Sequence, residues 1–453
     1  MKSMAMRVAA TLLTLCALLS AVVWFLNVRG EAPLTSNANG TDTPERVAQG
    51  AYLARAGNCQ SCHTQRGSDA PDAKRGSDAP DGKRGGAAYA GGRGVPTPFG
   101  TVYAPNLTSH TTHGIGAWTA DEFWRAMHHG RSRDGRLLYP AFPYANTTRI
   151  TRADSDLLLT FLRSVPAAAR ANTPHDLAFP FNLQASLAVW RALYFRPSQQ
   201  VPDPSRSAQW QRGAYLIEGL GHCNACHTNR NALGATTGAL DLAGGLIPVQ
   251  NWYAPSLRST AEAGVMDWDA QHIVELLKTG VVARGEAMFS VAGPMASVVL
   301  GSTQHLSDAD LHAMAAYLQA LPRTVSPVAP SALTAPEAVN QQAASLYTQH
   351  CAQCHGEQGE GRRTTDGKQP VYPALAGNRA VTLPSAANLV HVVLEGGFAP
   401  ATAGHPRPFG MPPFATVLSD ADVALLLTHL RRSWGHRSEA VSALNVSRVR
   451  NGR

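Results

Sequence analysis

The chain is poor in charged and aromatic residues, which make up 15% and 7% of its 453 residues. It is rich in turn-forming residues, with 30 prolines and 40 glycines. This balance favours small helical modules joined by long loops over one large sheet-based enzyme. The sequence also lacks a basic patch interleaved with aromatic residues, so the formal net charge of +8 is no indication of nucleic-acid binding.

Cysteine is scarce as well, and six of the seven cysteines fall in a repeated Cys-x-x-Cys-His motif. Two thiols at this spacing can add to the two vinyl groups of one porphyrin, and the adjacent histidine then lies under the iron as its proximal ligand. The sequence therefore predicts three covalently bound haem c groups. Their attachment residues are Cys59, Cys62, Cys223, Cys226, Cys351 and Cys354, and their proximal iron ligands are His63, His227 and His355.

Other uses of these motifs explain less of the sequence. A structural zinc site would need two more ligands at a regular spacing, and no second Cys-x-x-Cys or His-x-x-x-His follows any copy. A thioredoxin-like dithiol follows a strand in a βαβ unit and does not need the trailing histidine. Disulfides within the motifs would also leave the three histidines unexplained.

One long apolar run is present, from Val8 to Val28, with Lys2 and Arg7 before it and Arg29 after it. It is long enough to cross a bilayer as a helix. Its length and the lack of a clear cleavage site favour an uncleaved signal anchor in residues 1–35 over a cleaved signal peptide. Either one exports the chain, and haem attachment to this motif normally occurs outside the cytoplasm. We therefore expect haem domains on the periplasmic side of the inner membrane.

The sequences around the motifs are repeated too. Gly50–Leu53 recurs as Gly213–Leu216, and Tyr103–Leu107 recurs as Tyr253–Leu257, with Tyr372–Leu375 as a looser third copy. These repeats predict an all-α fold of three tandem class-I cytochrome c domains after an N-terminal transmembrane helix. The expected domains are residues 42–170, 205–325 and 337–436, with linkers at 171–204 and 326–336 and a basic tail at 437–453.

Each repeated loop contains a proline, namely Pro105, Pro255 or Pro373. Its carbonyl is available to accept a hydrogen bond from Nδ1 of the motif histidine, which would fix the tautomer that faces the iron. A simple turn proline is the alternative for each copy. A closing helix follows in each domain, at Arg152–Ser164 and after the N-capping residues Ser307 and Ser419.

The sixth iron ligand should come from the segment before the closing helix. Met295 and Met411 occupy matching places in the second and third repeats, and methionine opposite histidine raises the haem potential. Core packing is the alternative for both. The first repeat has Phe142 at this place, and phenylalanine cannot bind iron. Nearby candidates upstream are Met127, His128 and His129, on a helix expected over Thr119–Gly130, where such residues more often pack in the core or face solvent.

Two segments depart from the repeats. Residues 66–85 contain RGSDAPDAK followed by RGSDAPDGK, a polar duplication that is interpreted as a flexible insertion in the first domain. Phe179–Phe195 is rich in large apolar residues. It is expected to pack as an interdomain helix, with docking to a partner or a membrane as the alternative.

Short motifs along the chain resemble one family. They are CHT, YAPNLT, YPAFPY, FPFNL, CNACHT, WYAPSL, GPMASVV, STQHLSDADL, CAQCHG and PFGMPPF. Their order is similar to that in the three-haem cytochrome c subunits of bacterial membrane-bound dehydrogenases. Such subunits serve quinoprotein alcohol dehydrogenases, flavin-dependent gluconate or sorbitol dehydrogenases, and molybdenum hydroxylases that act on aldehydes or on N-heteroaromatics such as nicotinate.

The resemblance implies electron transfer from a catalytic dehydrogenase subunit to ubiquinone or a terminal oxidase, with no catalytic residues for substrate oxidation in this chain. Members that serve alcohol or sugar dehydrogenases usually read YPAMPY where this chain has Tyr139–Tyr144, so its phenylalanine favours a molybdenum-hydroxylase partner. The alternatives are an alcohol or a gluconate/sorbitol dehydrogenase as partner. An alternative of a different class is a haem enzyme that reacts with peroxide or oxygen at the first haem.

Overall fold

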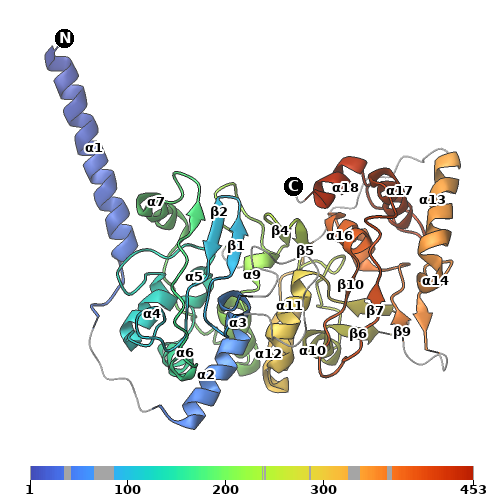
Figure 1. Ribbon diagram of the computed structural model, residues 1–453, viewed down its shortest axis with the longest axis horizontal. Coiled ribbons are helices and arrows are strands. Elements are labelled where there is room, and N and C mark those ends of the chain that lie inside the picture. Colours follow the sequence, from blue (N-terminus) through green and yellow to red (C-terminus); the bar gives the residue numbers. More distant parts are fainter. Residues whose placement is uncertain are drawn as a thin grey trace. The chain divides into compact units, whose positions relative to one another are not determined.

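The computed structural model describes residues 2–34, 42–65, 86–236, 238, 241–284, 287–324, 337–364 and 370–451. The chain divides into two compact units (Figure 1). The first unit comprises Met1–Ala54 and Cys62–Val201, and the second comprises Arg55–Ser61 and Pro202–Arg453. The insertion expected at 66–85 and the linker expected at 326–336 lie outside the described residues.

Helices dominate the part of the chain up to residue 201, and the closing helix α6 has the bounds that the sequence predicted. The elements are α1 (Lys2–Val28), α2 (Pro44–Ala56), α3 (Cys59–His63), β1 (Gly94–Thr97), β2 (Gly100–Tyr103), α4 (Ala120–His129), α5 (Tyr144–Thr147), α6 (Arg152–Ser164), β3 (Asp176–Leu177) and α7 (Gln184–Tyr194). The strands form one antiparallel sheet in the order β1-β2-β3, in which Gly94 pairs with Tyr103 and Gly100 pairs with Leu177.

The remaining elements follow the same plan twice. They are α8 (Ala208–Tyr215), the π-helical segment η2 (Leu216–Leu220), α9 (Asn224–His227), β4 (Gly245–Ile247), β5 (Trp252–Ala254), α10 (Ala270–Thr279), β6 (Val281–Arg284), β7 (Ala287–Ser290), α11 (Pro294–Gly301), the 3₁₀ turn η3 (Thr303–His305), α12 (Asp308–Gln319), α13 (Glu337–His350), α14 (Ala352–His355), β8 (Arg362–Arg363), β9 (Pro370–Tyr372), α15 (Arg379–Thr382), α16 (Ala387–Glu395), β10 (Gly397–Phe398), β11 (Gly410–Met411), α17 (Asp420–Leu430) and α18 (Ala443–Arg450).

Small antiparallel strand pairs distinguish this fold from the expected all-α chain. The second unit contains the pairs β4-β5, β6-β7, β8-β9 and β10-β11. Each pair lies in a segment between two helices. Pairing there satisfies backbone amide and carbonyl groups that would otherwise lack partners.

The repeated Gly-Ala-Tyr-Leu sequence marks a close helix crossing. A Cβ on Gly50 of α2 would lie 2.0 Å from the carbonyl oxygen of Leu157 in α6, and a Cβ on Gly213 of α8 would lie 2.0 Å from that of Ala313 in α12. Both positions therefore require glycine, because any side chain would separate the first helix of the repeat from its closing helix.

The second repeat has one residue more than the first between this glycine and its haem motif. The structure accommodates it in the π-helical segment η2, which continues directly from α8. A π-helical turn can take up a single inserted residue, and the backbone kinks within this segment at Gly219, whose φ of −93° and ψ of −106° are not helical. The close contact of the glycine with the closing helix and the haem motif that follows it are therefore present in both repeats.

Serine and threonine caps begin the helices that the sequence placed there. The Thr119 side chain accepts from the amide of Glu122 at the start of α4, and Ser307 and Ser419 do the same for Asp310 in α12 and Asp422 in α17. Each cap satisfies an amide that has no partner inside its helix.

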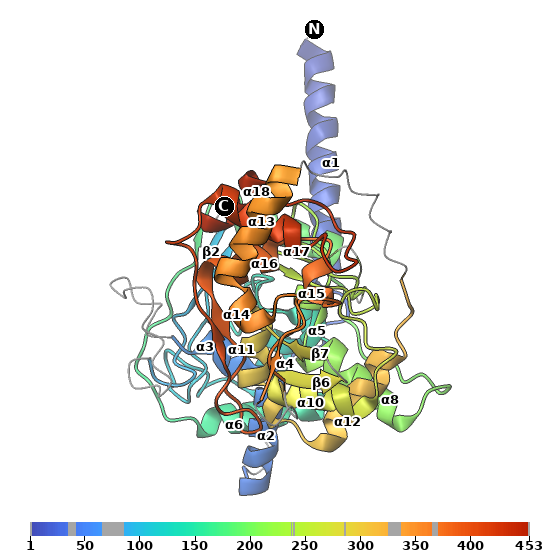
Figure 2. The ribbon, with the colours of Figure 1, turned by 90° about the vertical axis from the view of Figure 1, so that its right-hand side faces the viewer.

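The segment expected to be a basic tail forms helix α18 instead. It packs beside α16 and α17 (Figure 2), and Val446 and Val449 join the hydrophobic core of this part of the chain. Arg450 forms an ion pair with Asp420, with 2.6 Å between Nε and Oδ1. The segment was predicted from its basic composition alone, and the spacing of Val446 and Val449 on one face of a helix was overlooked.

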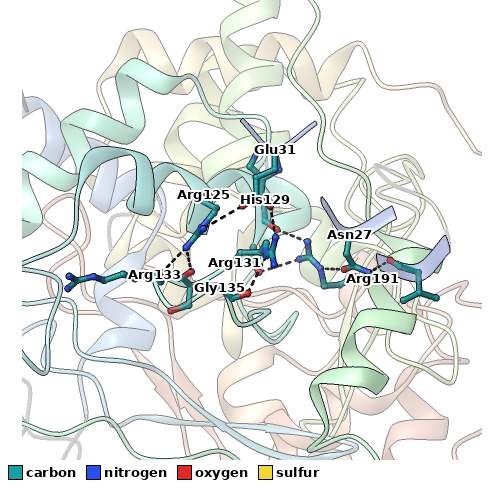
Figure 3. A network of polar contacts seen from close by, with 11 residues as sticks. Asn27, Glu31, Arg125, His129, Arg131, Arg133, Gly135 and Arg191 are labelled. Atoms are coloured by element: carbon teal, nitrogen blue, oxygen red, sulfur yellow. Dashed lines mark hydrogen bonds and ion pairs between the residues drawn. The ribbon is translucent and has the colours of Figure 1, made fainter. Parts of the chain in front are cut away.

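Helix α1 is long and apolar enough over Ser3–Val28 to cross a membrane. Its last turn packs against α7, where Asn27 Nδ2 donates to the carbonyl oxygen of Ala188 at 2.9 Å. Beyond the helix, Glu31 forms ion pairs with Arg131 at 2.8 Å and Arg125 at 3.7 Å (Figure 3). The helix is therefore tied to the body of the first unit.

Candidate haem-attachment sites

Each Cys-x-x-Cys-His motif forms a single helical turn, in α3, α9 and α14. This local geometry places the two cysteines, three residues apart, and the adjacent histidine on one compact turn. In the first two motifs the preceding residue, Asn58 or His222, has a positive φ, of 48° and 38°. The chain therefore turns sharply just before the first cysteine in both repeats.

The three motif histidines make the contact that the repeated prolines predicted. The distance from Nδ1 to the proline carbonyl oxygen is 2.8 Å for His63 and Pro105, 2.7 Å for His227 and Pro255, and 2.8 Å for His355 and Pro373. A carbonyl only accepts, so Nδ1 carries the proton and donates. Nε2 is then the unprotonated nitrogen, which is the form that binds a metal.

Burial strengthens this preference for the neutral ring. It is the main cause that lowers the pKa of His63, His227 and His355, against the smaller opposing effect of the proline hydrogen bonds. Burial also raises the pKa of the Cys223 thiol to about 12 and that of Cys351 to about 11. A neutral imidazole with Nε2 free, next to two cysteines of the same turn, is the set of residues that a covalently bound haem c needs.

Three glycines that were not predicted from the sequence hold the proline loops in place. The amides of Gly91, Gly244 and Gly361 donate to the carbonyl oxygens of His63, His227 and His355 at 2.8, 2.9 and 2.7 Å. All three have positive φ, and a Cβ on any of them would come within 2.7 Å of backbone atoms of the proline loop. The sequence signal was the repeated Ala-Gly-Gly at Ala90–Gly92 and Ala243–Gly245.

The methionines expected as sixth ligands lie in different elements, Met295 in helix α11 and Met411 in strand β11. Met411 pairs with Gly397 and packs against the hydrophobic cluster that contains Cys351. Met295 is the second residue of α11 and is half-buried, and the preceding Gly293 packs against the Trp252 ring. Iron ligation by either methionine stays a prediction.

The candidates near the first motif have other surroundings. Helices α4, α10 and α16 each end at a glycine with positive φ, and the third residue before that glycine is buried in all three. These residues are Met127, Leu277 and Val393, so Met127 occupies a core position. His128 stacks on Trp124, with ring centroids 4.4 Å apart, and lines a cavity of about 600 Å³. Phe142 lies in the turn before α5, where its amide donates to the Tyr139 carbonyl oxygen at 3.0 Å.

Within the second unit, segments from different repeats meet close to the motifs. His222 Nε2 lies 3.4 Å from the carbonyl oxygen of Gly57, just before the second and first motifs. Trp252 stacks on His391 of α16, with centroids 4.7 Å apart and planes 9° apart. Tyr253 and Asn388 exchange two hydrogen bonds of 2.8 Å. These contacts hold the loop that carries Pro255 against helix α16 of the third repeat.

Comparisons with known proteins agree with these sites. The family model "Cytochrome c" matches residues 47–166, and the model "Cytochrome C oxidase, cbb3-type, subunit III" matches residues 338–430. The cytochrome c subunit of a quinone alcohol dehydrogenase from Gluconacetobacter polyoxogenes is 34% identical, over 89% of this chain and 84% of that protein.

Two further relatives come from different dehydrogenases. The gluconate 2-dehydrogenase cytochrome c subunit of Pantoea cypripedii is 34% identical over 89% of both chains. In Pseudomonas putida, one subunit of nicotinate dehydrogenase is 37% identical over 88% of this chain and 31% of that protein. Haem c binding and electron transfer are common to cytochrome c domains. The chain belongs to the family of cytochrome c subunits of membrane-bound dehydrogenases.

Proposed function

We propose that the chain carries three covalent haems c, one in each of three tandem domains, and conducts electrons from a catalytic dehydrogenase subunit to ubiquinone or a terminal oxidase. Helix α1 would anchor it in the inner membrane, with the haem domains in the periplasm. The observation that carries the proposal is the threefold repetition of one site, in which a proline carbonyl and a glycine amide hold each motif histidine.

Each haem would supply an iron centre that takes up and releases one electron. The chain's residues orient and insulate that centre. His63, His227 and His355 would present Nε2 to the iron, and the proline carbonyls prevent the rings from rotating. Met295 and Met411 would complete the coordination of the second and third haems and raise their potentials.

The contacts between repeats support a continuous route. Gly57 and His222 bring together the backbones that precede the first and second motifs. Trp252 and His391 join the second repeat to helix α16 of the third. Short, packed paths of this kind suit electron transfer along one chain.

The haem count tests the proposal. The intact mass of the denatured chain should exceed that of the polypeptide by three haems, and a pyridine haemochrome should give three equivalents of c type. Replacing both Cys223 and Cys226 with Ala should remove one haem and leave two. Fewer than three haems in the unaltered chain, or haem extracted by acidic acetone, contradicts the proposal.

For the catalytic partner, we propose a molybdenum hydroxylase for aldehydes or N-heteroaromatics. Phe142 supports this choice, as does the similarity to a subunit of nicotinate dehydrogenase. Purification of the complex through a tag on this chain should yield a partner that contains molybdenum. A partner that instead contains a quinone cofactor or flavin would assign the chain to an alcohol or a gluconate/sorbitol dehydrogenase.

A further inference from the structure

Helix α7 has an unusual surface for a helix at the outside of a protein. Its only charged residue is Arg191, whose side chain is 3% exposed. The guanidinium donates to the carbonyl oxygens of His129 and Gly130, at 2.7 and 3.3 Å, and lies over the ring of Phe195, 4.7 Å from its centroid. The one charge of the helix therefore points into the first unit.

The outward face of α7 and the turn before it carry large apolar side chains. Val189 and Leu193 are one helical turn apart and are 48% and 66% exposed. Phe179 and Leu183 precede the helix and are 78% and 44% exposed. Four exposed large apolar side chains without a charged neighbour on the helix are costly in water and mark a face that is covered in the working protein.

Helix α1 indicates what covers it. Asn27 in the last turn of α1 joins α7 twice, because its Nδ2 donates to the Ala188 carbonyl oxygen and its Oδ1 accepts from Arg191 Nε, each at 2.9 Å (Figure 3). A span that leaves the bilayer at Val28 therefore holds α7 at the membrane surface. Trp24 and Phe25 of α1 are exposed at the same end, as expected for an aromatic belt at the lipid headgroups.

We propose that α7 lies in the interfacial layer of the bilayer beside α1, with Val189, Leu193, Leu183 and Phe179 among the upper acyl chains. The partner is a phospholipid surface, and α7 acts as a second, non-spanning membrane contact. This inference rests on the membrane anchor of the proposed function. It fixes the orientation of the first unit above the membrane, which one spanning helix alone would not do.

Lipid photolabelling of the full chain in its complex tests the inference. The complex is placed in bilayers that contain a phospholipid with a diazirine near the top of its acyl chain, and labelled peptides are mapped by mass spectrometry. Label should appear in α1 and in residues 179–194. Leu193→Glu should lower the labelling of α7 at least about threefold, because a carboxylate is unfavourable among acyl chains.

A matched leucine provides the control. Leu444 lies on helix α18 and is 61% exposed, close to the value for Leu193. Leu444→Glu should leave the labelling of α7 unchanged, and the haem content of both variants confirms that they fold. Label in α1 without label in α7 overturns this inference and leaves the anchor intact. Absence of label from both overturns the anchor as well, and cross-links from α7 to the dehydrogenase subunit would make it a subunit interface instead.

Discussion

The imidazole Nε2 of His222 lies 3.4 Å from the backbone carbonyl oxygen of Gly57. Gly57 is two residues before Cys59, and His222 directly precedes Cys223. One side chain thus bridges the starts of two haem motifs that are far apart in the sequence. Burial also lowers the pKa of His222, so the neutral ring donates from Nε2 to the carbonyl oxygen.

We expect His222→Asn to slow electron transfer between the first and second haems. Asparagine tolerates the positive φ at this position but does not reach Gly57. Haem content and the separate haem spectra should stay unchanged, and stopped-flow reduction by the donor should show a slower second phase. His312→Asn is the control, because the His312 ring bonds within its own helix, to the Asp308 carbonyl oxygen. Equal rates in all three proteins would show that the contact has no role in the transfer.

Gly244→Ala should destabilise the second haem site more than an ordinary glycine substitution. Its φ is +84°, and the new Cβ would lie 2.7 Å from the amide nitrogen of Ser256, beside Pro255. The expected loss in free energy of unfolding is about 2–5 kcal/mol, from backbone strain and overpacking together. Chemical denaturation and the spectrum of the second haem provide the measurements.

Gly377→Ala separates these two causes. Gly377 has a similar φ of +69°, but a Cβ there would have no atom within 4 Å. This variant should lose only about 1–2 kcal/mol, from strain alone. If both variants lose the same amount, Gly244 does not hold the proline loop by close approach.

Met295→Leu and Met411→Leu should each remove the near-infrared sulfur-to-iron band of one haem and lower its potential, because the soft thioether stabilises reduced iron. Leucine keeps the side-chain volume, so the free energy of unfolding should fall by less than about 1.5 kcal/mol. Met288→Leu, in strand β7, is the control and should keep both bands. A variant at Met295 or Met411 with an unchanged band would assign that methionine to core packing.

Phe142→Met should create a third His/Met signal in low-temperature magnetic spectroscopy. A low-potential haem suits the point where electrons enter the chain. The new sulfur would raise the potential of the first haem and slow electron transfer from the first haem to the second, because that step would lose driving force. Redox titration of the variant gives the potential. Three His/Met haems in the unaltered protein would contradict both the ligand assignment and this direction of transfer.

The free energy of unfolding should depend on pH partly through His129. Burial is the main cause that lowers the pKa of His129 to about 4, whereas an unfolded histidine has a pKa of about 6.5. The unfolded chain therefore binds more protons between these values, and the free energy of unfolding falls as the pH falls through this window. Thermal unfolding should show a smaller pH dependence in His129→Gln than in wild type. An equal dependence would mean that the pKa of His129 is the same in the folded and the unfolded chain.

The sequence was informative wherever a contact depends on a repeated local pattern. Pro105, Pro255 and Pro373 were predicted as histidine partners because each recurs at a fixed place after its motif. Gly91 was missed although Ala-Gly-Gly recurs in the second repeat, because its close approach to the Pro105 backbone forms only in three dimensions. Asn27 and Arg191 are 164 residues apart, and no pattern in the sequence connects them. The sequence predicted helix α7 as an interdomain helix, and its packing on α1 was not predicted.

The contacts of Arg191 bear on how the chain is processed. Asn27 supplies one partner of this buried cation, and Glu31 supplies one for both Arg131 and Arg125. A peptidase that removed the leader after folding would take these partners away from three arginines. Buried Arg191 would keep its bonds to the carbonyl oxygens of His129 and Gly130 but lose the one to Asn27, and a buried donor without its partner is unfavourable. We therefore expect the leader to stay attached in the mature protein, and a soluble protein trimmed of residues 1–35 should be more stable with a neutral residue in place of Arg191.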